Sequence, residues 1–206
     1  MRKLWIIMFL GLVALNVAAQ NQAYASLKDL FAHKADTIGL LKIEKRTNNQ
    51  MMMAAGGDYK ITSANDALNK RIKKRCYGIC SNGALYLNCR KLRFNKFRFG
   101  TCYVAAMWVG SNLYFCAPPV GPAEASVTPA RNYAMGAIGQ AISSSSMVSD
   151  RVFYEIDSLT LKVDFVSKEK MSSLLKNHPN LLAEYLSENS EAAKVVAKYL
   201  RLLQKK

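Results

Sequence analysis

Five cysteines and two histidines are the residues of this 206-residue chain whose types could do nucleophilic chemistry. A cysteine nucleophile needs a general base, and His33 and His178 are the histidines that could serve. Catalytic cysteines are usually found at a helix N-terminus or in a strained turn, whereas these five lie in strand-like sequence between Cys76 and Cys116. The pattern favours structural cysteines, and a hydrolase with an unrecognised active site is the alternative function.

Motifs for a metal or a cofactor are absent from the sequence. Cys76 and Cys80 have a C-x3-C spacing, and no second cysteine pair at zinc-ribbon spacing follows them. The chain also has no phosphate-binding P-loop, dinucleotide fingerprint or nucleophile elbow. We therefore assign no catalytic residue, no metal and no cofactor.

Asn82-Gly83 is the strongest turn signal in the chain. Asn and Gly tolerate the positive φ that a type I′ hairpin turn needs at both central residues. A two-residue loop at this point places Cys76 opposite Cys89 as a non-hydrogen-bonded pair. Because the Cα atoms of such a pair lie about 4.5 Å apart, within disulfide reach, we predict a Cys76–Cys89 disulfide.

Asn95-Lys96 is a second turn signal. A two-residue loop here places Phe94 opposite Phe97 on one face of the hairpin. The other face then carries Arg93 directly opposite Arg98. Like charges that face each other across a strand pair are destabilising, so this pair needs solvent, a counterion or a ligand.

The two turns give conflicting registers around Cys89. Counting from the second turn places Cys102 opposite Cys89, whereas counting from the first places Cys76 there. The apolar residues also change parity between the two turns, which a β-bulge near Arg90-Lys91 explains. We favour the pairing with Cys76, because Asn-Gly is the stronger turn signal.

A third turn at 110–112 completes a four-stranded antiparallel meander, which Pro118-Pro119 ends. Another hairpin is predicted from residues 152–156 and 162–166. We therefore predict the α+β class, with an antiparallel β-sheet of hairpins, short helices and a C-terminal helical segment. The predicted helices cover residues 25–31, 168–176, 179–188 and 191–204, and one more helix begins after a cap at residue 63 or 65 and ends near residue 75. Residues 47–57 are predicted as a loop.

Residues 1–20 have the pattern of a secretory signal peptide. Arg2-Lys3 is followed by the apolar run Leu4–Val13 and by small residues before an expected cut near Gln20. The run is shorter than the ~20 residues of a membrane span, so no transmembrane span is expected after removal of the signal. We expect export to the periplasm, the outer-membrane surface or the extracellular space, where disulfides are permitted.

The mature chain divides into two predicted parts. Residues 21–166 form a β-rich core domain, and the helices of 167–206 are packed on it or appended to it. The core includes a segment rich in Gly, Ala and Ser at 120–150. For residues 130–148 the sequence leaves open a helical, a disordered and a membrane-associated state.

The net charge is +15, and its distribution is uneven. No acidic residue lies between Asp66 and Glu124. A basic stretch of this kind predicts a face for acidic polysaccharide or an anionic membrane surface, with an ordinary solvated face as the simpler alternative, and export argues against nucleic acid. The predicted anion-binding residues are Lys74, Arg75, Arg90, Lys91, Arg93, Lys96 and Arg98.

Several short motifs are similar to those of one family. They are the leader ending Ala18-Ala-Gln20, Lys42-Ile-Glu-Lys-Arg46, Ala84-Leu-Tyr-Leu-Asn-Cys-Arg-Lys-Leu-Arg93, Val152-Phe-Tyr-Glu-Ile-Asp157 and Lys168-Glu-Lys-Met-Ser-Ser-Leu-Leu175. Together they resemble exported proteins of Bacteroides-type bacteria, over nearly the whole mature chain. The resemblance implies an envelope or secreted location, and the family has no known activity, so no catalytic residue is carried over.

Overall fold

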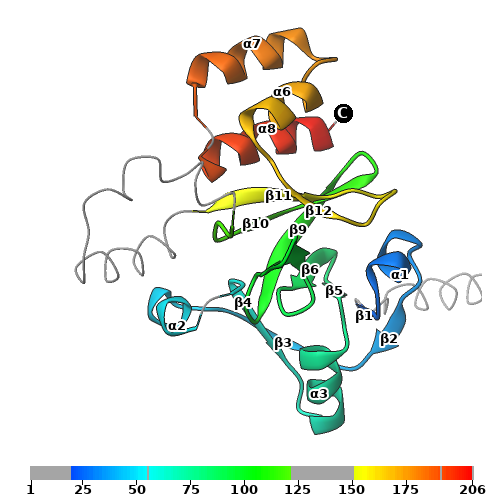
Figure 1. Ribbon diagram of the computed structural model, residues 1–206. Helices are drawn as coiled ribbons and strands as arrows, with labels where there is room; N and C mark the ends of the chain where they lie inside the picture. The colour runs from blue at the N-terminus through cyan, green and yellow to red at the C-terminus, as the bar shows by residue number, and fades with distance from the viewer. Residues whose placement is uncertain (1–19, 55, 122–150, 191, 206) are drawn as a thin grey trace, which may run out of the picture.

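The computed structural model describes residues 20–54, 56–121, 151–190 and 192–205. These residues form a strongly twisted, ten-stranded sheet with short helices around it (Figure 1). Every strand pair in that sheet is antiparallel, so the predicted α+β class is confirmed. Residues 1–19 of the predicted leader and residues 122–150 of the Gly, Ala and Ser segment lie outside the described residues.

The sheet has the order β12-β11-β10-β9-β6-β5-β1-β2, and the β3–β4 pair joins β9 where Tyr59 faces Tyr103. Its strands are β1 (Asn21–Tyr24), β2 (Asp36–Ile38), β3 (Lys42–Lys45), β4 (Tyr59–Thr62), β5 (Gly78–Ser81), β6 (Ala84–Asn88), β9 (Tyr103–Val109), β10 (Asn112–Ala117), β11 (Val152–Ile156) and β12 (Val163–Phe165). The predicted meander is therefore present as β5, β6, β9 and β10, which are neighbours in that order.

The predicted hairpin turns form as their residues require. Asn82 and Gly83 both have positive φ (50° and 76°), as a type I′ turn needs. At the second turn Asn95 has a φ of 52°, and it joins the two-stranded hairpin β7 (Arg93–Phe94) and β8 (Phe97–Arg98). This hairpin is separate from the main sheet, although β7 follows β6 in the chain and β8 precedes β9.

The bulge predicted near Arg90-Lys91 is replaced by a local turn. The amide N–H groups of Lys91 and Leu92 both donate to the carbonyl of Asn88 (2.9 and 3.3 Å). The facing residues 99–102 lie outside the strands as well. The two segments outside the strands, residues 89–92 and 99–102, have the same length. Strands β7 and β8 therefore pair in the register that β6 and β9 would have if their ladder continued.

The predicted Cys76–Cys89 disulfide is not formed, and both residues are free thiols. The register counted from the first turn is correct over β5 and β6, but Cys76 lies beyond the ladder at the end of a helix. Its N–H donates to the carbonyl of Arg71 (3.1 Å). Cys89 instead donates its N–H to the carbonyl of Cys102 (2.9 Å), the residue that counting from the second turn places opposite it.

Six helices are described. They are α1 (Leu27–Phe31), α2 (Asn48–Met53), α3 (Asp66–Lys74), α6 (Lys168–Leu174), α7 (Pro179–Glu188) and α8 (Ala193–Gln204). Ser26, Asn65 and Ser167 cap α1, α3 and α6 by accepting a backbone N–H. Helix α2 corrects the loop predicted over 47–57, because Thr47 and Gln50 form a reciprocal capping box there. None of the described helices is long and apolar enough to cross a membrane.

Side chains of β9 contribute to hydrophobic clusters on both faces of the sheet. Val104 points into a cluster that α1 and the β7–β8 hairpin close. On the other face, Tyr103 packs near α3 and Met107 packs against α6, α7 and α8. The three C-terminal helices therefore lie on one side of β9, β10 and β11, and α3 lies at the opposite end of the molecule (Figure 1).

A buried carboxylate joins this helical layer to the sheet. Glu155 of β11 is 1% exposed and accepts hydrogen bonds from Asn112 Nδ2 (2.8 Å) and from the Tyr114 hydroxyl. Its other oxygen is paired with the ammonium of Lys170 on α6. Burial and the Glu155 carboxylate raise the pKa of Tyr114, and the hydrogen bond and charge of Glu155 raise the pKa of Lys170.

Candidate anion-binding site

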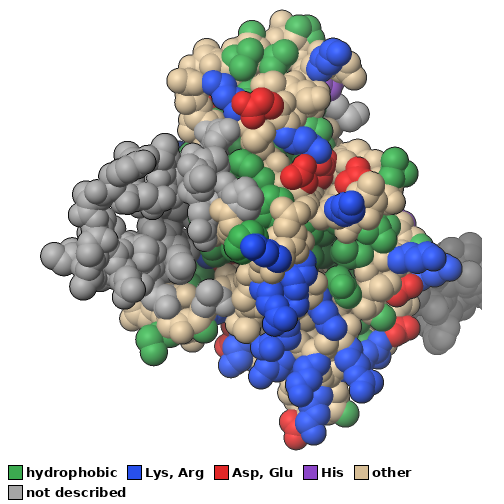
Figure 2. Space-filling model, viewed as in Figure 1, with side chains coloured by type: hydrophobic (Ala, Val, Ile, Leu, Met, Phe, Trp, Pro, Cys, Tyr) green, Lys and Arg blue, Asp and Glu red, His purple; other side chains and the backbone are tan. Residues whose placement is uncertain are grey.

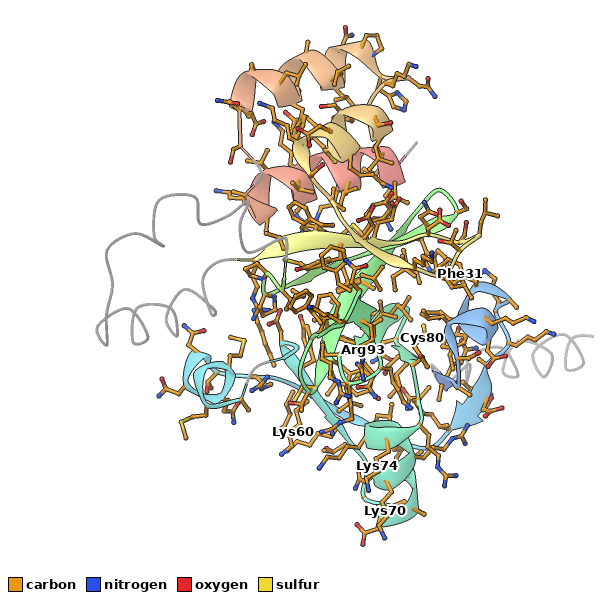
Figure 3. All side chains as sticks on the ribbon, in the orientation of Figure 1. Phe31, Lys60, Lys70, Lys74, Cys80 and Arg93 are labelled. Carbon is orange, nitrogen blue, oxygen red and sulfur yellow. The ribbon has the colours of Figure 1, made fainter. Side chains whose placement is uncertain are left out.

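Lys and Arg side chains gather on one face of the protein, from its centre down over α3 (Figure 2). Three separate stretches of the chain meet there, which are β4, α3 and residues 90–98. In Figure 3, Lys70 and Lys74 lie on α3, with Arg93 above them and Lys60 to one side. We define the basic face by Lys60, Lys70, Lys73, Lys74, Arg75, Arg90, Lys91, Arg93 and Arg98.

The predicted cross-strand pair of arginines is present on this face. Arg93 faces Arg98 in the β7–β8 hairpin, and both are exposed. The Arg93 guanidinium donates to the backbone carbonyls of Arg90 (3.0 Å) and Leu92 (2.8 Å). Because these carbonyls satisfy part of the guanidinium, the pair does not by itself define a ligand site.

The two predicted lysines of this region lie over aromatic rings. Lys91 Nζ is 5.8 Å from the centre of the Tyr77 ring, and Lys96 Nζ is 5.7 Å from that of Phe97. Cation–π contacts at exposed sites are weak, about 0.5–1 kcal/mol, and leave the charge accessible to solvent. Both lysines therefore add positive potential at the hairpin without forming a pocket.

The last two predicted residues, Lys74 and Arg75, lie at the C-terminal end of α3. With Lys70 and Arg71 they line a shallow hollow of about 460 Å³ on the outer side of the helix. Arg71 is paired with the carboxylate of Asp36, which reduces the positive charge of this hollow. Cations in the last turn also interact favourably with the helix dipole, so this cluster has a structural role without any ligand.

A deeper hollow of about 510 Å³ lies between α3, β4 and the segments after β6 and before β9. We call it the basic cleft. It is lined by Lys60, Ile61, Thr62, Asn69, Lys73, Asn88, Arg90, Thr101, Cys102 and Tyr103. Three of these side chains are cationic and none is acidic. The sequence prediction included Arg90, but it missed Lys60 and Lys73.

No ion pair joins the three cations of the basic cleft to any other described residue. Glu44 lies opposite Lys60 in the β3–β4 pair, but its carboxylate is bound to Lys42 (2.9 Å). Within the described part of the chain, no carboxylate in the cleft lining offsets these three charges, so an anion from solution can do so.

Two buried side chains hold the walls of the cleft. Asn88 Nδ2 donates to the carbonyls of Ile72 (3.2 Å) and Cys76 (2.9 Å), and Asn88 Oδ1 accepts the N–H of Arg90 (3.1 Å). The Tyr103 hydroxyl also donates to the carbonyl of Ile72 (2.7 Å), and burial raises its pKa, so it stays a neutral donor. These bonds cap the negative end of α3 and join it to the loop that carries Arg90.

The histidines lie elsewhere. His33 packs against Trp108, with ring centres 5.6 Å apart, and His178 is the N-cap residue of α7. No Asp, Glu or His lines either of the two basic hollows. Among the described residues, no group of three or more His, Cys, Asp or Glu side chains could hold a metal ion.

Comparison with known proteins identifies a family and no function. Neither the curated proteins nor the solved structures include a match to this chain. The model of a family of unknown function, DUF6563, matches residues 22–206, which runs from β1 to the C-terminus. The chain belongs to the family DUF6563.

Proposed function

We propose that this protein is an exported, non-enzymatic protein of the cell envelope or the extracellular space, and that its basic face binds an anionic polymer or membrane surface. The basic cleft carries the proposal, because Lys60, Lys73 and Arg90 share one hollow without an acidic neighbour in its lining. An anion between these cations replaces their mutual repulsion by charge-assisted contacts, of which the arginine contact can be bidentate.

The described lining of the basic cleft does not favour the hydrolase alternative. Hydrolysis by a cysteine or a carboxylate pair needs a positioned base, and the walls of the basic cleft supply none. Cys102 lines the cleft, but no histidine lies beside it there. The lining is suited to holding an anion and not to activating a nucleophile.

Export is supported by the position of the first strand. Strand β1 begins at Asn21, directly after the expected cut near Gln20, so cleavage there leaves every described strand intact. N-terminal sequencing of protein from the native host should begin near Asn21. Recovery of the chain from the cytoplasm with residues 1–20 still attached would contradict export.

Binding is tested by charge reversal at two places. Arg93→Glu with Arg98→Glu should weaken binding to a sulfated polysaccharide and to anionic vesicles far more than Lys176→Glu with Lys194→Glu, which lie on the helical layer. Lys198 is unsuitable as a control, because it bridges Glu184 and Glu188. Wild-type binding should fall steeply with salt, since exposed charges are screened beyond about 10 Å at 0.1 M.

The contrary outcomes are distinct. If both double variants weaken binding equally, only net charge matters and the basic face is not the site. If the wild-type protein binds neither the sulfated polysaccharide nor the anionic vesicles at low salt, the face is an ordinary solvated one and the proposed function is wrong.

A further inference from the structure

We propose that the basic cleft is a discrete site for one compact oxyanion, a sulfate or a carboxylate, carried by a sugar unit of a soluble acidic saccharide. The inference rests on the proposed function and names its ligand class. It assigns the specific contacts to the cleft and a supporting, long-range role to the rest of the basic face.

The three cations reach the cleft from three different elements. Lys60 lies on β4, Lys73 on α3 and Arg90 in the turn after β6. Strand β4 is paired with β3 along its whole length, and Asn88 fixes the backbone of Arg90. Because all three side chains start from held backbone, only the side chains, and not the backbone, must be ordered when they close on an anion.

The remaining lining is suited to the uncharged part of a sugar. A hollow of about 510 Å³ lies within the usual range for small-molecule sites, about 300–1,000 Å³, and exceeds what a bare sulfate ion fills. Thr62 provides a hydroxyl, and the largely buried Ile61 and Tyr103 provide a small apolar surface. A sugar ring has hydroxyl groups and apolar C–H faces, so it is complementary to this mixture.

The position of the cations in a hollow favours a saccharide over a bilayer. Lys73 points to the cleft, whereas Lys70 and Lys74 line the outer hollow of the same helix. A flat lipid surface would first meet the outer side of α3. A saccharide can place one charged group inside the cleft, and its binding affinity then depends on Lys73.

These two sides of α3 give a matched test. We would titrate the full-length mature protein with a defined heparin-type hexasaccharide by calorimetry at 0.15 M salt. Lys73→Gln and Arg90→Gln should each weaken binding by about tenfold or more, because each removes a charge-assisted contact in a shared site. Lys70→Gln and Lys74→Gln remove the same charge from the outer hollow of α3, away from the cleft, and should weaken binding by about twofold or less.

Competition by inorganic sulfate gives a second readout. At constant ionic strength, sulfate should displace the hexasaccharide from the wild-type protein and displace it poorly from Lys73→Gln. Thermal melts of each variant confirm that the fold is intact, which is expected because all four side chains are exposed.

Each other outcome overturns a stated part of the argument. Equal losses at Lys73 and Lys70 would remove the cleft as the site and leave the proposed basic face standing. Binding to anionic vesicles alone, dependent on Lys70 and Lys74, would replace the saccharide by a lipid surface. Absence of binding to either at low salt would overturn the proposed function together with this inference.

Discussion

Replacing Lys170 by Met tests how the helical layer is attached to the sheet. Lys170 of α6 pairs with Glu155 of β11, whose side chain is 2% exposed. Met keeps most of the aliphatic stem and removes the charge. The carboxylate is then left with its hydrogen bonds from Asn112 and Tyr114.

The expected cost follows from the burial of the two partners. Removing one partner of a fully buried ion pair costs about 3–5 kcal/mol, and a hydrogen bond to a charged group contributes about 1.5–3 kcal/mol. The Lys170 side chain is 36% exposed, so water can reach its place and the lower range applies. We expect Lys170→Met to lower the free energy of unfolding by about 2 kcal/mol, or about 4–8 °C in Tm.

The pH dependence has a definite sign. Glu155 raises the pKa of Lys170 above its ordinary value of 10.5, so the native state holds the proton more tightly than the unfolded state. The stabilisation is therefore complete below pH 10.5 and is lost as the pH rises through the native pKa. The raised pKa of Tyr114 acts in the same direction above its ordinary value of 10.0.

Urea denaturation at pH 7, 9 and 11 measures both effects. The difference between wild type and Lys170→Met should be largest at pH 7 and should shrink at pH 11. The double variant Glu155→Gln with Lys170→Met should cost less than the sum of the single changes, because the two groups interact directly. Equal stability of wild type and Lys170→Met at pH 7, or a difference that grows towards pH 11, would refute the reasoning.

Two further predictions concern glycines and thiols. Gly57→Ala should cost more than about 4 kcal/mol in thermal melts, because a Cβ would lie 2.1 Å from the backbone oxygen of Tyr103. Gly83→Ala meets no atom within 4 Å but keeps a φ of 76°, so about 1 kcal/mol is expected, and the reverse order would contradict the packing. Burial raises the pKa of the Cys89 thiol well above its usual range, so iodoacetamide at pH 8 should label the half-buried Cys102 before Cys89, as mass spectrometry would show. Equal labelling rates would be inconsistent with a buried Cys89.

Local signals in the sequence predict most of the sheet. Asn82-Gly83 determines the register of β5 and β6 because the turn and its strands are adjacent in the chain. The disulfide prediction was wrong because counting from a turn takes no account of the helix end that holds Cys76. The capping box of α2 was visible as Thr47-x-x-Gln50, but the Gly and Met residues around it masked the signal.

The site was harder to predict than the fold. Arg90 was identified because it lies in the acid-free stretch beside the second hairpin. Lys60 precedes that stretch and reaches the cleft only through the long-range contact of Tyr59 with Tyr103. Lys73 lies in the stretch, but its orientation towards the cleft depends on how α3 packs on β4 and β9. Both residues become visible only when tertiary pairing is known.

The place of β1 in the sheet has a consequence for how the chain is made. β1 lies between β2, which follows it closely, and β5, which is synthesised much later. While the chain emerges from its N-terminus, β1 and β2 can form a ribbon around α1, but the edge of β1 that faces β5 has no partner. An open strand edge is a template for pairing with another chain. Two copies of this protein can therefore join through β1 while residues 39–77 are being made. Pairing of β5 with β1 closes this interval.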